Sequence, residues 1–132
     1  MRGVRVSATL QDYLETILQL SENGGRARIS DIASVLRNSK PSVTQAVGVL
    51  RSMRLVSQDK YGPVHLTPEG VKHARKVLAR HKALTRFLVD ALGVNPAVAE
   101  SDACAIEHAI SDETFERLLV FMDGQSTLRS GN

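Results

Sequence analysis

The order of patterned segments in the first 66 residues constrains the fold most strongly. Residues 9–21 repeat leucine and isoleucine at helical spacing, and the run 23–25 (Asn-Gly-Gly) ends that helix. Ser30 is expected to cap a short helix that ends near Leu36, and Pro41 lies in the first turn of another that ends near Met53. Short apolar runs at 55–56 and 64–66 flank the turn-forming loop 59–63, which predicts a β-hairpin.

Helix, short helix, tight turn, helix and hairpin is the order of a winged helix-turn-helix. A major groove about 12 Å wide admits one helix, so the second helix of the pair needs small or hydrogen-bonding side chains on its outward face. Gln45 can pair with adenine, and Ser42 and Thr44 can bind bases or phosphates. A small α+β lobe with an unused polar face is the alternative. The candidate DNA-binding residues are Arg37, Ser39, Lys40, Pro41, Ser42, Thr44, Gln45, Arg51 and Lys60.

The charge distribution separates the chain into two parts. Residues 1–82 carry 14 Lys/Arg and 6 Asp/Glu, whereas residues 83–132 carry 3 and 8, so the two parts differ in sign within a net charge of +3. The basic part suits a polyanion. The sequence has no apolar stretch long enough to span a bilayer and no secretory apolar core at its start, so a cytoplasmic protein without a membrane partner is expected. Its single cysteine agrees with a reducing compartment.

The second part reads as entirely helical. A long helix starts at Thr67-Pro68-Glu69 and runs to about Leu92, another opens at Asn95-Pro96, and a third is capped by 111–113 and ends near Asp123. The expected fold is therefore mainly α, a winged helix-turn-helix followed by a helical domain. The expected domains are 1–70 for DNA binding and 71–124 for dimerisation and metal binding, with 125–132 as a flexible tail.

Three metal-competent side chains share one helical face in this second part. Cys104, Glu107 and His108 stand at positions i, i+3 and i+4. Asp12 and Glu15 form an anionic pair on the first helix, and His81 lies on the long helix. Taken singly, each has an ordinary explanation: a solvated acidic face, a packed histidine, a small buried cysteine. The prediction of a metal site depends on their joint occurrence.

These motifs together resemble the DtxR/MntR family of metal-dependent transcriptional repressors, over about residues 9–120. The resemblance is carried by Asp12-x-x-Glu15, the run 39–45 (Ser-Lys-Pro-Ser-Val-Thr-Gln), the run 66–70 (Leu-Thr-Pro-Glu-Gly), Arg80-His81, Cys104-x-x-Glu107-His108 and 111–113 (Ser-Asp-Glu). It implies a short, two-domain member whose metal ligands are Asp12, Glu15, His81, Cys104, Glu107 and His108.

The resemblance gives conflicting indications of the metal. The carboxylate pair Asp12 and Glu15 matches manganese sensors, whereas Cys104 stands where iron sensors have cysteine and many manganese sensors have glutamate. Oxygen-rich sites suit Mn²⁺ and a thiolate favours softer metals. We expect Mn²⁺, with Fe²⁺ as runner-up and other divalent transition metals substituting in vitro. Glu100 is a possible further ligand, although a solvated acid is the simpler interpretation.

The expected function is a transcriptional regulator, a repressor by resemblance, that controls metal-uptake or homeostasis genes. It would bind palindromic operator DNA as a homodimer when a cation links its two lobes. No small organic substrate and no catalytic residue are expected, so the chain is not predicted to be an enzyme. The open alternatives are a winged-helix regulator with a non-metal effector and, behind it, a metal-dependent hydrolase. The apolar residues Ile106, Ile110, Phe115, Leu118, Leu119 and Phe121 are candidates for the dimer contact or for packing within one chain.

Overall fold

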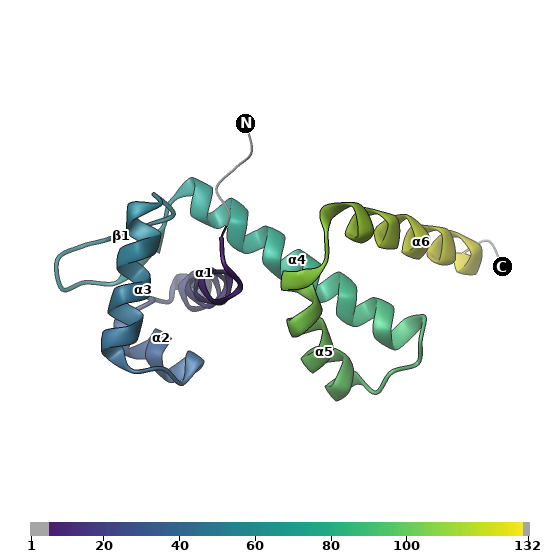
Figure 1. Ribbon diagram of the computed structural model, residues 1–132, viewed down its shortest axis with the longest axis horizontal. Helices are drawn as coiled ribbons and strands as arrows, with labels where there is room; N and C mark the ends of the chain where they lie inside the picture. Colours follow the sequence, from purple (N-terminus) through teal and green to yellow (C-terminus); the bar gives the residue numbers. More distant parts are fainter. Residues whose placement is uncertain (1–5, 131–132) are drawn as a thin grey trace. The chain divides into compact units, whose positions relative to one another are not determined.

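The computed structural model describes residues 6–130 of the 132-residue chain, the side chains of Asn23 and of 125–130 excepted. It divides into two compact units (Figure 1), the first ending at Val77 and the second beginning at Leu78. Each unit is described by itself below. The fold is mainly helical with one small sheet, which confirms the predicted fold class.

Three helices form the body of the first unit. They are α1 (Ala8–Ser21), α2 (Ile29–Leu36) and α3 (Lys40–Ser52), and the short 3₁₀ helix η1 (Glu22–Gly24) follows α1. The three pack on one another, and their shared core includes the fully buried Leu14, Ile17, Ile32, Val43 and Leu50. Burying side chains of this size supplies the main stabilisation of so small a unit.

The hairpin completes the first unit. Strands β1 (Val56–Gln58) and β2 (Val64–Leu66) pair antiparallel, with Ser57 opposite His65. An additional bridge joins Val64 to Ala27, whose carbonyl accepts the Val64 N–H at 2.7 Å. This bridge holds the chain extended up to Arg28, so α2 begins at Ile29 with Arg28 as its N-cap. The prediction that Ser30 caps α2 was therefore wrong.

The long helix α4 (Pro68–Asp90) begins as predicted. Thr67 Oγ1 accepts the Gly70 N–H at 3.1 Å and donates to the Arg54 carbonyl at 2.7 Å, which fixes the helix start on the chain that leaves α3. Gly70 is required here because a Cβ at this position would lie 1.9 Å from the Leu55 carbonyl oxygen. The start of α4 and the residue that precedes β1 are thereby in direct contact.

The second unit contains the carboxyl-terminal part of α4 together with α5 (Pro96–Ala109) and α6 (Asp112–Ser130). Asn95 Oδ1 caps α5 at the Ala97 N–H, and Ser111 Oγ accepts the Thr114 N–H at the start of α6. The Phe87 and Phe121 rings meet edge to face at 6.1 Å, which joins α4 to α6. The expected end of the last helix near Asp123 was wrong, because α6 continues to Ser130.

None of the helices within residues 6–130 is both long enough and apolar enough to cross a bilayer.

Candidate functional site

The first candidate site is the outward face of α3 in the first unit. Its amino-terminal residues are exposed, whereas Val43, Val47 and Leu50 on the opposite face are buried. The exposed residues are Lys40, Pro41, Ser42, Thr44 and Gln45. In a helix that binds the major groove, the amino-terminal residues contact the base edges. The small and hydrogen-bonding side chains exposed at this end of α3 are the kinds that such contacts require.

Ser39 and Ser42 are engaged with each other at the start of α3. The Ser39 hydroxyl accepts the Ser42 N–H at 3.2 Å and donates to the Ser42 hydroxyl at 2.9 Å. Ser39 therefore serves as the N-cap of α3, and the Ser42 hydroxyl keeps its own proton to donate outward. Arg37 ends α2 in a left-handed conformation.

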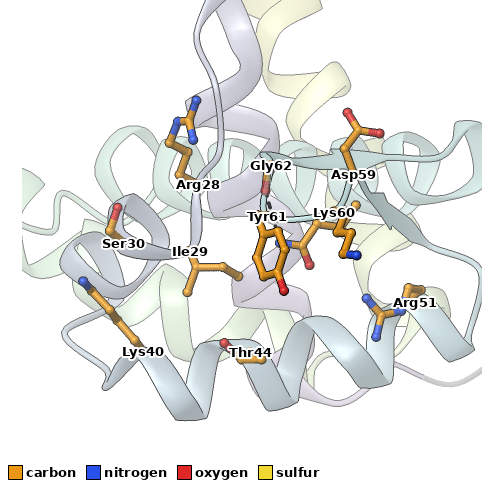
Figure 2. A pocket seen from close by; sticks show the side chains of 11 residues that line it. Arg28, Ile29, Ser30, Lys40, Thr44, Arg51, Asp59, Lys60, Tyr61 and Gly62 are labelled. Atoms are coloured by element: carbon orange, nitrogen blue, oxygen red, sulfur yellow. Dashed lines mark hydrogen bonds between the residues drawn. The ribbon is translucent and has the colours of Figure 1, made fainter.

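A basic hollow of about 570 Å³ lies between α3, the start of α2 and the hairpin loop. Figure 2 shows Lys40, Thr44 and Arg51 along α3, with Lys60 and Tyr61 of the loop facing the same space. The hollow is lined by Arg28, Ile29, Ser30, Lys40, Thr44, Arg51, Gln58, Asp59, Lys60, Tyr61 and Gly62. Four cationic side chains against one carboxylate give it the charge that a phosphate backbone attracts.

The loop that faces α3 is held in a defined turn. The Gly62 N–H donates to the Asp59 carbonyl at 2.8 Å, and Gln58 Nε2 donates to the Gly62 carbonyl at 3.1 Å. Tyr61 adopts a positive φ of 58° and is 92% exposed, with the Lys60 ammonium 5.7 Å from its ring centroid. A strained, exposed aromatic residue beside a cation is a candidate contact to a ligand.

Arg28 and Tyr61 were not among the predicted DNA-binding residues. Arg28 precedes a helix and Tyr61 lies in a turn, and neither position carries a periodic signal. Their positive or aromatic character was visible, but their place in the hollow depends on the bridge between Ala27 and Val64. Of the predicted set, Lys40, Thr44, Arg51 and Lys60 line the hollow.

The second candidate site centres on Glu107 of α5 in the second unit. The Glu107 side chain is only 1% exposed, and its two oxygens face two imidazoles. Oε2 lies 3.2 Å from His81 Nδ1, and Oε1 lies 3.4 Å from His108 Nε2. A carboxylate removed from water is unfavourable unless cations or hydrogen bonds compensate it, so this arrangement requires positive charge.

His81 has a carboxylate at each ring nitrogen. Besides Glu107 at Nδ1, Glu100 Oε1 lies 2.7 Å from Nε2. A neutral imidazole has one donor and one acceptor nitrogen, so two carboxylates are both served only by a protonated ring or by a cation between one pair. Metal-ligating histidines commonly give their other nitrogen to a carboxylate in this way. The donor set therefore fits a divalent cation.

Cys104 and Glu100 share a surface hollow with His81. This hollow of about 470 Å³ is also lined by Ser101 and Ala105, and Cys104 is exposed. The structure thus brings four predicted ligands of the second unit, His81, Cys104, Glu107 and His108, to neighbouring positions on α4 and α5. It adds Glu100, for which a solvated surface acid had been the simpler interpretation.

Asp12 and Glu15, the remaining predicted ligands, belong to the first unit. Both are half-buried on α1, one helical turn apart. Tyr13, Leu14, Thr16, Ile17 and Leu18, the buried residues of the same helix, point into the core. The Asp12 and Glu15 side chains therefore lie on a different face of α1 from its buried apolar residues.

Two family models match the chain. Residues 5–64 match the "Iron dependent repressor, N-terminal DNA binding domain", and residues 67–127 match the "Iron dependent repressor, metal binding and dimerisation domain". The junction between the two matches falls at the start of α4.

Named relatives and solved structures agree with these matches. An uncharacterised HTH-type transcriptional regulator of Methanocaldococcus jannaschii is 39% identical over 120 residues, which cover 89% of this chain and 95% of that protein. The transcriptional regulator MntR of Salmonella typhimurium is 36% identical over 118 residues, covering 89% and 74%.

The solved structure of the manganese regulator SloR superposes with a TM-score of 0.77 at 29% identity. The match covers 91% of this chain and 55% of that one, so this chain spans about half the length of the solved protein. The comparisons give no support to a non-metal effector or to a hydrolase. The two domain matches and the length-wide similarity to named regulators show that the chain belongs to the DtxR/MntR family of metal-dependent transcriptional repressors, which are DNA-binding proteins.

Proposed function

We propose that this chain represses transcription as a homodimer that binds two-fold symmetric operator DNA when it is loaded with Mn²⁺, or with Fe²⁺ as the second choice. The observation that carries the proposal is the buried Glu107 carboxylate between His81 and His108. Uptake or homeostasis of the same metal is the fitting class of regulated genes.

The proposed ligands come from both units. Asp12 and Glu15 of α1 would join His81, Cys104, Glu107 and His108, and Glu100 would either bind the cation or orient His81 from its other nitrogen. Carboxylates outnumber the single sulfur, and hard oxygen ligands suit Mn²⁺. The similar protein SloR is a manganese regulator, which supports the same choice. Selectivity against Zn²⁺ must come from geometry and availability, because affinity alone favours later metals.

The bound cation would supply positive charge to carboxylates that repel one another in its absence. Because the proposed ligands belong to two units, binding would favour one arrangement of the DNA-reading unit relative to the other. In a dimer this arrangement sets the distance between two copies of α3, and palindromic half-sites recur at about 34–36 Å or multiples of it. Coupling of about 1–3 kcal/mol is typical, and operator DNA must then tighten metal binding by the same factor.

The DNA-binding roles divide by chemistry. Gln45, Thr44 and Ser42 at the start of α3 would read base edges, with Pro41 shaping the helix start. The phosphate contacts would come from Lys40, Arg37 and Arg51. Lys60 would reach the flanking groove, joined by Tyr61 and Arg28 of the same hollow. Ser39 would act through the cap that holds Ser42.

The dimer contact is proposed to use the exposed apolar side chains of α6. Val120 is 69% exposed and Phe121 49% exposed, and Leu119 is exposed beside them. Exposed apolar residues that lie together are typical of association surfaces. The matching family model describes this part of the chain as a dimerisation domain.

The proposal is tested by selecting duplexes from a random-sequence pool with the Mn²⁺-loaded protein. Fluorescence anisotropy with the selected duplex then compares Mn²⁺, Fe²⁺ and a chelator at fixed ionic strength, with metal stoichiometry measured alongside. We expect enrichment of a two-fold symmetric sequence and binding that is lost in chelator. Glu107→Ala or His108→Ala should abolish the metal-stimulated component, whereas the exposed Glu116→Gln should not. Equal affinity with metal and with chelator would refute the proposal.

A further inference from the structure

We propose that Arg80 is a positioning residue that fixes the last turn of α5, on which Glu107 and His108 stand, and joins it to the start of α6. The inference rests on the proposed function, since it concerns how the ligand-bearing turn is held. It assigns a role to a charged side chain that is only 13% exposed and that neither DNA binding nor metal ligation uses.

Arg80 contacts two separate segments of the second unit, the end of α5 and the start of α6. Its Nη1 donates to the Ile110 carbonyl at 3.0 Å and to the Glu107 carbonyl at 3.5 Å. Its Nη2 pairs with Asp112 at the first residue of α6. The guanidinium carbon lies 5.2 Å from the centroid of the Phe115 ring. One side chain of α4 therefore holds the end of α5 and the beginning of α6.

The end of α5 needs such a donor. The last carbonyls of a helix have no partner within the helix, and many helices satisfy them with a residue in the left-handed conformation. Ile110, which ends α5, is instead extended, with φ −74° and ψ 137°. The carbonyl of Glu107 is one of those that a left-handed cap would satisfy. Arg80 provides the donors from another helix, and its planar fork serves two acceptors at once.

The position of Arg80 makes this contact relevant to the metal ligands. It directly precedes His81 on α4, so one helical turn supplies both a proposed ligand and the group that holds the backbone of another. The hydrogen bonds of Arg80 go to the two carbonyls and to Asp112 rather than to the Glu107 carboxylate. Its charge therefore orders the turn without neutralising the ligand.

The test compares Arg80→Met, which keeps most of the apolar stem, with Arg80→Lys and the matched control Arg86→Met. Arg86 is also on α4 but its side chain is 69% exposed, and its Nε lies 3.9 Å from Asp90. Mn²⁺ affinity is measured by competition with a fluorescent chelator, the Mn²⁺ environment by electron paramagnetic resonance, and Tm in excess chelator. Affinities are measured well below the Tm of every variant.

Removing groups that orient metal ligands commonly lowers affinity about 10–100-fold. We expect a loss of about that size for Arg80→Met with an altered Mn²⁺ spectrum, partial recovery in Arg80→Lys, and a change of less than about twofold in Arg86→Met. A purely structural role would lower the Tm of Arg80→Met and leave its Mn²⁺ affinity and spectrum as in the parent chain. That result would overturn the inference.

Two further outcomes are decisive. If Arg80→Met does not fold, Arg80→Lys decides alone, and parent-like Mn²⁺ affinity and spectrum in that variant overturn the inference. If the parent chain binds no Mn²⁺ or Fe²⁺, the proposed function fails together with the inference. If the parent chain binds metal and DNA as proposed, and Arg80→Met has the same Mn²⁺ affinity and spectrum as the parent chain, only the role of Arg80 is contradicted.

Discussion

Replacing Glu107 with glutamine distinguishes two effects of the metal site on the free energy of unfolding: the destabilisation by a buried carboxylate without metal, and the stabilisation by bound metal. The glutamine side chain has almost the same shape, so the packing around a side chain that is 1% exposed is preserved. The change removes the negative charge between His81 and His108. Since a neutral imidazole needs no counter-charge, no uncompensated buried ion is left behind, and the usual penalty for breaking a buried pair does not apply.

The magnitude follows from these opposing terms. Replacing buried ion pairs by neutral groups is often neutral or stabilising by about 1–4 kcal/mol, and the retained polar amide places this substitution at the lower end, near 1 kcal/mol. For a domain of this size that corresponds to a rise in Tm of about 3–5 °C in chelator. In the parent chain, Mn²⁺ at about 100 times its Kd should add about 2.7 kcal/mol. The glutamine variant should gain almost none of this.

The assay is thermal unfolding of both proteins, followed by circular dichroism, once in excess chelator and once in Mn²⁺. The expected pattern is a crossover, in which the variant is the more stable protein without metal and the parent chain the more stable with it. A variant destabilised by more than about 2 kcal/mol in chelator would contradict the argument from desolvation. A metal-induced shift equal to that of the parent chain would remove Glu107 from the ligand set.

Four other substitutions and one change of condition test separate steps. Gln45→Ala should change base preference in a duplex selection, whereas Arg51→Ala should weaken binding to all duplexes and lower the salt slope by about 1; unchanged preference in Gln45→Ala would mean that α3 does not read bases. Val120→Asp should lower the dimer fraction in sedimentation velocity without unfolding the chain, because Val120 is 69% exposed and the substitution places a charge on the exposed apolar surface of α6. Metal-stimulated DNA binding should weaken as the pH is lowered, because protons compete with the cation for the ligands; a flat pH profile in anisotropy titrations would argue against the proposed ligand set. Gly70→Ala should destabilise the protein by about 2 kcal/mol or more in denaturant unfolding, since its Cβ would overlap the Leu55 carbonyl.

The local parts of the fold were predictable because local residues determine them. Thr67 caps α4, Asn95 caps α5 and Ser111 caps α6, as the sequence indicated. The start of α2 was not predictable, because it depends on pairing between Ala27 and Val64, which are distant in sequence. The end of α6 also differs from the prediction, because the polar composition after Asp123 indicates a helix end, whereas the helix continues to Ser130.

The site shows the same division. Spacing on one helix indicated that Cys104, Glu107 and His108 share a face, and the structure places Glu107 and His108 in contact. The contact of Glu100 with His81 joins two helices, so no periodicity in either helix reveals it. The proposed roles of Arg80 and Tyr61 could not be predicted for the same reason, since each depends on contacts or a hollow formed with another segment. Sequence thus identified which groups are chemically competent, and tertiary contacts determined which of them meet.

The arrangement around Glu107 also explains why a cation should have a large effect on this chain. A nearby arginine is the usual way to neutralise a buried carboxylate, and Arg80 is within reach of the Glu107 backbone. Arg80 is directed instead to two carbonyls and Asp112, whereas the Glu107 carboxylate faces imidazoles that hold charge only when protonated. If an arginine were paired with the Glu107 carboxylate, the carboxylate would be neutralised at every metal concentration, and the site would not need a metal ion. Because the imidazoles are charged only conditionally, the stability and arrangement of the site respond to a charge that arrives from solution, and this response is the physical requirement for a metal-dependent switch.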